Sequence, residues 1–121
     1  MGIKELVQKA YENASRKGFW EDWRDIKGSK KHKTVKIQTG HAEDNLINNA
    51  LGNRLMLITG EVAEAHEALR KIDYKNFKEE LADIVIRVAD LAGGLDIDLD
   101  EEIKKKMKKN RNRPYKHGKA F

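Results

Sequence analysis

Gly60-Glu61-Val62-Ala63-Glu64-Ala65 and Glu79-Glu80-Leu81-Ala82-Asp83 are the two segments that decide the fold of this chain. Each segment carries two acids three residues apart, and residues at that spacing lie on one face of a helix, one turn apart. In both segments the first acid of the pair borders the apolar stripe of its helix. An acid in that position is costly to bury unless a cation compensates its charge.

The apolar residues around the two acid pairs predict two long helices. The first covers residues 45–71, and the second begins at residue 76, where Asn76 is expected to cap it, and ends at Gly93-Gly94. The stripe of the first helix comprises Leu46, Ile47, Ala50, Leu51, Leu55, Ile58, Val62, Ala65 and Leu69, and that of the second Phe77, Leu81, Ile84, Val88, Leu91 and Ala92. Because the connection at residues 72–75 is short, the two helices are expected to be antiparallel neighbours.

This pairing brings four carboxylates to one level of the helix pair, where they repel one another. A hard, oxygen-seeking cation such as Mg²⁺ would resolve the repulsion. The alternative is that these are ordinary solvated acids at the edges of amphipathic helices. Di-iron chemistry is disfavoured, because Glu64 and Asp83 stand where its Glu-x-x-His motif needs histidine.

The flanking sequence adds two further helices and a loop. Residues 2–17 carry a helical apolar pattern that Gly18 ends, and the pattern after Asp98 predicts a last helix that Pro114 stops. Residues 24–44 lack periodicity and are expected to form a mobile basic loop, with an irregular tail at 114–121. The prediction is a single domain over 1–121 with an all-α fold, an antiparallel four-helix bundle.

Composition excludes several classes of protein. The 121 residues contain no cysteine, so disulfides and thiolate metal sites are absent, and no stretch approaches the roughly 20 apolar residues of a membrane span. A cytoplasmic location is expected. The formal charge of +5 is concentrated in two basic segments, residues 24–36 and 104–119, which flank the acidic centre. Such an arrangement suits a polyanionic ligand, either a small phosphate compound or a nucleic acid.

The acid pairs, followed by Lys106-x-x-x-Asn110-x-x-Arg113-Pro114-Tyr115, resemble the signature of the MazG-like all-α nucleoside triphosphate pyrophosphohydrolases. The resemblance covers roughly residues 46–119. It implies cleavage of a nucleoside triphosphate to the monophosphate and pyrophosphate, dependent on Mg²⁺ with Mn²⁺ as a possible substitute. It also implies assembly as a homodimer or homotetramer.

By the same resemblance, specific residues receive roles. The four acids Glu61, Glu64, Glu80 and Asp83 become the metal ligands and catalytic residues, while Lys106, Asn110 and Arg113 become contacts to the phosphates or sugar. If the last helix continues to Arg113, these three residues lie along one side of it.

The remaining candidates are judged from their spacing alone. Trp20 and Trp23 could stack on a base, although packing in the core or at an interface is the favoured role for both. Arg87, four residues after Asp83, is expected to pair with that acid within the helix. Two other functions stay open. One is a nucleic-acid-binding helical protein that uses the basic segments, although a nucleic-acid partner is disfavoured; the other is a non-catalytic helical regulator.

Overall fold

The computed structural model of the chain describes residues 1–28 and 42–121. Over these residues it is helical, without a strand. The helices are α1 (Ile3–Arg16), α2 (Glu21–Gly28), α3 (Ala42–Arg70), α4 (Tyr74–Gly94) and α5 (Leu99–Arg111), followed by the short 3₁₀ turn η1 (Tyr115–Gly118). The all-α fold class predicted from the sequence is therefore confirmed.

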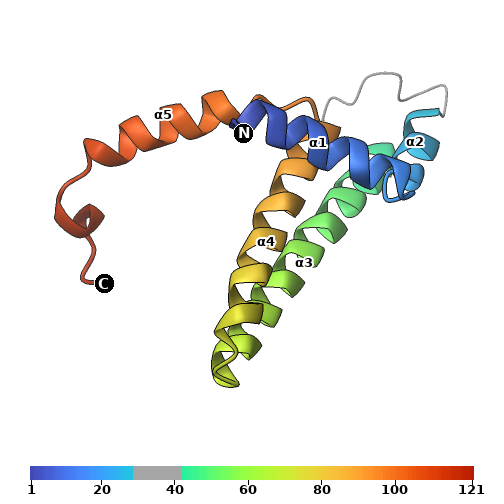
Figure 1. The fold of residues 1–121 in the computed structure, drawn as a ribbon. Helices are drawn as coiled ribbons and strands as arrows, with labels where there is room; N and C mark the ends of the chain where they lie inside the picture. Colours follow the sequence, from blue (N-terminus) through green and yellow to red (C-terminus); the bar gives the residue numbers. More distant parts are fainter. Residues whose placement is uncertain (29–41) are drawn as a thin grey trace.

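The helices α3 and α4 form a long antiparallel hairpin, as the short connection predicted (Figure 1). Ile72 adopts a positive φ of 56° at the turn, where the chain reverses. Asp73, and not the expected Asn76, caps α4: its side chain accepts a hydrogen bond from the Asn76 backbone N–H at 3.1 Å. The cap lies one turn earlier than predicted because Asp73 reaches the free N–H groups of the first turn.

Helix α1 crosses one end of this hairpin and packs mainly against α4 (Figure 1). Two glycines near the end of α4 make the close approach possible. A Cβ atom at Gly93 would lie 2.6 Å from Cβ of Tyr11, and one at Gly94 would collide with the indole ring of Trp20. These residues therefore do more than end a helix, because they make room for α1 and for the largest side chain of the core.

Part of the predicted loop is helical. Residues 24–28 belong to α2, and α3 already begins at Ala42. The apolar residues of this region, Trp20, Trp23 and Ile26, are three apart, so one face of α2 packs on the core around Ile47. Because the segment contains many charged residues, this short apolar pattern was not recognised as a helix in the sequence. The rest of the predicted loop, residues 29–41, lies outside the part of the chain that the structure describes.

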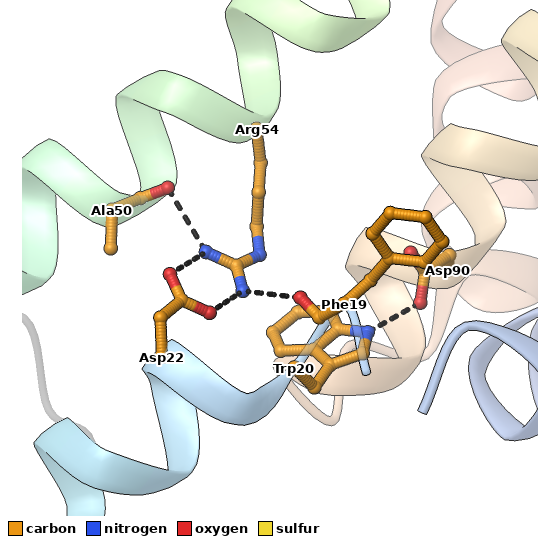
Figure 2. Close-up of polar contacts among 6 residues, drawn as sticks. All are labelled: Phe19, Trp20, Asp22, Ala50, Arg54 and Asp90. Atoms are coloured by element: carbon orange, nitrogen blue, oxygen red, sulfur yellow. Dashed lines mark hydrogen bonds and ion pairs between the residues drawn. The ribbon is translucent and has the colours of Figure 1, made fainter. Parts of the chain in front are cut away.

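Arg54 of α3 fixes α2 and the turn before it (Figure 2). Its guanidinium pairs with both carboxylate oxygens of Asp22, at 2.8 and 3.3 Å, and donates to the backbone carbonyls of Ala50 and Phe19 at 3.1 and 3.2 Å. The guanidinium carbon also lies 4.2 Å from the centre of the Trp20 ring, so the cation stacks on the aromatic face. One arginine thus joins three segments of the chain.

Helix α5 extends away from the hairpin and contacts α1, so within one chain it does not complete a bundle (Figure 1). Asp98 caps its start as expected, by accepting from the Glu101 N–H at 3.1 Å. It ends at Arg111, so the condition for Arg113 to lie along one side of the helix with Lys106 and Asn110 is not met. Among the helices described, none has both the length and the apolar character needed to span a bilayer.

The packing of Trp20 on Gly94 yields a stability prediction. Gly94→Ala should lower the free energy of unfolding by about 1–3 kcal/mol, because the new methyl group overpacks the core against the indole ring. Gly52→Ala is the control: nothing lies within 4 Å of its added Cβ, so Ala should stabilise the helix by up to about 1 kcal/mol. Thermal or urea unfolding measures both changes, and equal effects at the two positions would contradict this packing.

Candidate active site

Three of the four acids predicted to bind metal come together at the contact of α3 and α4. Glu61 and Glu64 lie one turn apart on α3, and Glu80 approaches them from α4. Each offers a carboxylate oxygen, and these oxygens all lie within 4.8 Å of one another. Asp83 lies outside this cluster; its side chain is exposed and, with Glu61, lines the cavity beside it.

Glu80 is the most constrained acid of the cluster. It is only 9% exposed, and its Oε2 atom is buried without a hydrogen-bond partner among the described residues. Burial, the hydrogen bond with Glu61 and the charge of Glu64 raise the pKa of Glu80 to about 7. The free protein therefore holds a proton at this position up to near-neutral pH, in a place that a cation could occupy instead.

Arg87 compensates one acid of the cluster from the cavity side. Its Nε donates to Oε1 of Glu61 at 2.7 Å, and this hydrogen-bonded ion pair holds the pKa of Glu61 below its usual value. The expected pairing of Arg87 with Asp83 inside α4 is wrong, because the side chain crosses to α3 instead. Spacing along one helix could not reveal this, since the partner is supplied by the neighbouring helix.

The chemistry of the donor set suits a metal ion. The three clustered residues offer only carboxylate oxygens, the ligands that hard divalent cations such as Mg²⁺ and Mn²⁺ prefer. The unpaired oxygen of Glu80 points to the same conclusion, because a buried acceptor without a partner is costly. The residues present therefore fit a divalent cation held by Glu61, Glu64 and Glu80.

A cavity of about 720 Å³ opens next to the cluster, a volume within the usual range for small-molecule sites. Its walls come from α1, from the turn before α2, and from the faces of α3 and α4 that look toward them. Glu61, Asp83 and Arg87 lie at its acidic end. Arg54 lies seven residues before Glu61 on α3, and Asp90 lies seven residues after Asp83 on α4. Both are therefore about two helical turns from the acidic end.

The tryptophans do not face this cavity. Trp20 and Trp23 are 1% and 3% exposed and form the core with Ile47, so their packing is observed and stacking on a ligand is disfavoured. Phe19, by contrast, is 65% exposed and lines the cavity. Phe19, Arg54 and Asp90 were not predicted as site residues. The aromatic run Phe19-Trp20-Glu21-Asp22-Trp23 carried a signal for Phe19, but neither Arg54 nor Asp90 belongs to a motif.

The predicted phosphate contacts lie far along the chain from the acids. Lys106 is exposed on α5, and Asn110 near the end of that helix has a buried Oδ1 without a partner in the described structure. Arg113 lies beyond the helix and donates to Nδ1 of His117 at 3.0 Å. Since α5 extends away from the hairpin, a single chain does not bring these three residues to the acid cluster.

The all-α hairpin thus gathers carboxylates from both of its helices beside a cavity, in an arrangement that could hold a metal ion. Comparison with known families agrees: the MazG nucleotide pyrophosphohydrolase domain matches residues 52–117. The match spans more than half of the chain, including both acid pairs and Lys106, Asn110 and Arg113, and the chain belongs to this family. Searches of curated proteins and of solved structures gave no significant match.

The raised pKa of Glu80 predicts how stability depends on pH in the presence of a chelator. A carboxyl group whose pKa is higher in the folded state favours folding when protonated, so its contribution is lost as pH rises from about 4.5 toward 7. Glu80→Gln resembles the protonated acid and should lack this loss. We therefore expect the melting temperature of Glu80→Gln, relative to wild type, to increase between pH 5 and 8.

Thermal unfolding in EDTA at a series of pH values measures this difference, and Glu79→Gln on the exposed side of α4 is the control. If the difference in melting temperature between wild type and Glu80→Gln stayed constant over this range, the pKa of Glu80 would not be raised in the folded protein.

Proposed function

We propose that this protein is a Mg²⁺-dependent nucleoside triphosphate pyrophosphohydrolase. It would convert a ribo- or deoxyribonucleoside triphosphate to the monophosphate and pyrophosphate, and so remove unwanted nucleotides from the cytoplasmic pool. The observation that carries this proposal is the buried Glu80, whose Oε2 has no partner among the described residues, in a cluster of three carboxylates of which Glu61 lines a cavity of about 720 Å³. Membership of the MazG family gives the reaction class that fits this site.

The residues of the chain have distinct tasks in this reaction. Glu61, Glu64 and Glu80 would hold the cation, which would supply neutralisation of the phosphate charge and activation of water. Arg87 keeps Glu61 ionised and fixes one of its oxygens. Asp83, exposed at the cavity wall, is either a fourth ligand or the acid that takes the proton from the attacking water.

In the proposed step a water oxygen bonds to the α-phosphorus as the bond from that phosphorus to the α–β bridging oxygen breaks. The electron pair of the broken bond leaves with pyrophosphate, and an acid of the site accepts the proton of the water. Lys106, Asn110 and Arg113 are the proposed contacts for the charge that develops on the leaving pyrophosphate.

Assembly of at least two chains is part of this proposal. The predicted stripe of α3 is buried at Ile47 and Ala65, but Leu55, Val62 and Leu69, seven residues apart, are 53%, 49% and 42% exposed. Leu81 and Val85 on α4 are likewise 46% and 52% exposed. Apolar stripes left open on both helices of the hairpin are typical of a surface that a second copy covers.

The same assembly would explain why α5 extends away from the hairpin of its own chain. A second copy that packs on the hairpin is expected to bring its own α5, with Lys106 and Asn110, to the acids of the first. The buried, unpaired Oδ1 of Asn110 supports a role in a contact that one chain does not complete. The proposed active site therefore combines acids of one subunit with basic and amide groups of another.

Substitution of the central acid tests the proposed chemistry. Glu80→Gln should keep the helical circular dichroism spectrum but lower kcat/KM by a factor on the order of 100 or more, because one ligand loses its charge. The isosteric control Glu79→Gln, on the neighbouring exposed position, should retain wild-type turnover. A panel of ribo- and deoxyribonucleoside triphosphates with Mg²⁺ provides the assay. Near-normal turnover by Glu80→Gln at low Mg²⁺ would show that Glu80 is not a metal ligand of the site.

Mixing two defective variants tests whether the site is shared between subunits. Lys106→Ala should lower kcat/KM by a factor on the order of 10–1000, as loss of a charged contact does. After unfolding and refolding together in equal amounts, Glu80→Gln and Lys106→Ala chains should recover about a quarter of wild-type activity. Half of random dimers are mixed, and each mixed dimer has one site with both residues intact.

Lys105→Ala is the control for Lys106→Ala, since its side chain points about 100° away around the helix. Activity of the mixture equal to the mean of the separate variants would show that each site is built within one chain. A fully active wild-type protein that sediments as a 13.9 kDa monomer would contradict assembly altogether.

A further inference from the structure

The cavity beside the acids has a second end with its own chemistry. Phe19 and Asp90 line the cavity together with Arg54, about two helical turns from Glu61 and Asp83 along the hairpin. Two turns correspond to roughly 10 Å at 1.5 Å per residue, which is comparable with the span from phosphates to base in an extended nucleotide. A triphosphate bound at the acids would therefore place its base near Phe19 and Asp90.

Phe19 offers an exposed aromatic face at the cavity. The ring is 65% exposed and borders the cavity, although its neighbour Trp20 is almost completely buried. The backbone of Phe19 is anchored, because its carbonyl accepts a hydrogen bond from Nη2 of Arg54 at 3.2 Å (Figure 2). An exposed ring on an anchored backbone is a suitable platform for stacking of a base, and stacking alone accepts any base.

Asp90 adds a directional group. Its Oδ1 accepts a hydrogen bond from Nε1 of Trp20 at 2.6 Å, which fixes the plane of the carboxylate (Figure 2). An ionised carboxylate accepts through both oxygens, and no described residue donates a hydrogen bond to Oδ2. The group is only half-buried and borders the cavity, so Oδ2 is available to a ligand. Burial raises the pKa of Asp90, while the hydrogen bond from Trp20 and the charges of Arg54 and Arg87 oppose this shift.

We propose that Phe19 and Asp90 form the base-recognition end of the site, and that Asp90 selects bases that present an exocyclic amino group, such as cytosine over uracil. This inference rests on the proposed function and names the class of substrate. An amino group donates a hydrogen bond to Oδ2 of Asp90. A carbonyl oxygen at the same place cannot form this bond, because both oxygens are acceptors. Sites built to pair a buried polar group discriminate strongly against analogues that leave it unpaired.

The matched substrates dCTP and dUTP test the proposal, because cytosine carries an amino group where uracil carries a carbonyl oxygen. Wild-type protein should prefer dCTP by a factor on the order of 10–100 in kcat/KM. Asp90→Asn keeps an oxygen that accepts from Trp20 but replaces the second oxygen with an N–H donor. The ratio of dCTP to dUTP should then fall at least about 10-fold, or invert, while the melting temperature changes little.

Two further variants separate the roles of the residues. Phe19→Ala should lower kcat/KM for both nucleotides by a similar factor, roughly 5- to 150-fold, and Phe19→Tyr should restore most of it. Asp96→Asn, an exposed acid at the end of α4 that does not border this cavity, should leave the ratio unchanged.

Calorimetric binding of the α,β-imido analogues of dCTP and dUTP, with Mg²⁺ present, distinguishes failure of this inference from failure of the proposed function. Binding with the predicted ratio but without hydrolysis of the natural nucleotides would retain the base site and reject the reaction. Hydrolysis with a ratio that Asp90→Asn does not alter would retain the reaction and overturn the base site. Failure of wild type to bind either analogue would overturn both.

Discussion

The burial of the Glu80 carboxyl group is the constraint that the α3–α4 hairpin has to accommodate. Its side chain lies at the contact of the two longest helices, where Glu61 and Glu64 add two more acids and one oxygen of Glu80 has no partner in the described structure. A hairpin optimised for stability alone would place apolar groups there, since removing an uncompensated charge from a buried position is favourable. The chain instead pairs only Glu61, through Arg87, and leaves the rest for a cation or a proton.

Arg54 joins α3 to α2 and to the turn before it. By binding Asp22 and the Phe19 carbonyl while stacking on Trp20, it holds the α1–α2 turn over the hairpin. The hydrogen bond from Trp20 to Asp90 ties the same turn to α4. The wall of the cavity opposite the acids is thus built by a small polar network around two buried indoles. Such a network positions groups more strictly than apolar contacts alone, because each hydrogen bond fixes a direction.

The sequence predicted the elements whose signals are long and periodic. The stripes of α3 and α4, the short connection between them and the two acid pairs were enough to predict the hairpin and to bring Glu61, Glu64 and Glu80 together. Helix α2 was missed because eight residues with many charges give little periodicity. The Glu61–Arg87 pair, the Arg54 contacts and the Trp20–Asp90 hydrogen bond join residues 26 to 70 positions apart, which spacing does not reveal.

The position of α5 shows a different limit of prediction from sequence. Its cap and the proline that follows it were recognisable in the sequence. The direction in which α5 leaves α4 was not, because α5 contacts α1 and extends away from the hairpin, whose residues Leu55, Val62 and Leu69 stay exposed in the single chain. The proposed roles of Lys106, Asn110 and Arg113 therefore depend on the proposed assembly, whereas the proposed roles of the acids do not.

Product analysis by ³¹P NMR, with purified protein, Mg²⁺ and a nucleoside triphosphate, tests the central claim most directly. The account predicts that the three triphosphate resonances are replaced by those of a nucleoside monophosphate and pyrophosphate in equal amounts, and that EDTA abolishes the reaction. Formation of a nucleoside diphosphate and orthophosphate, or an unchanged spectrum with every triphosphate supplied, would contradict it.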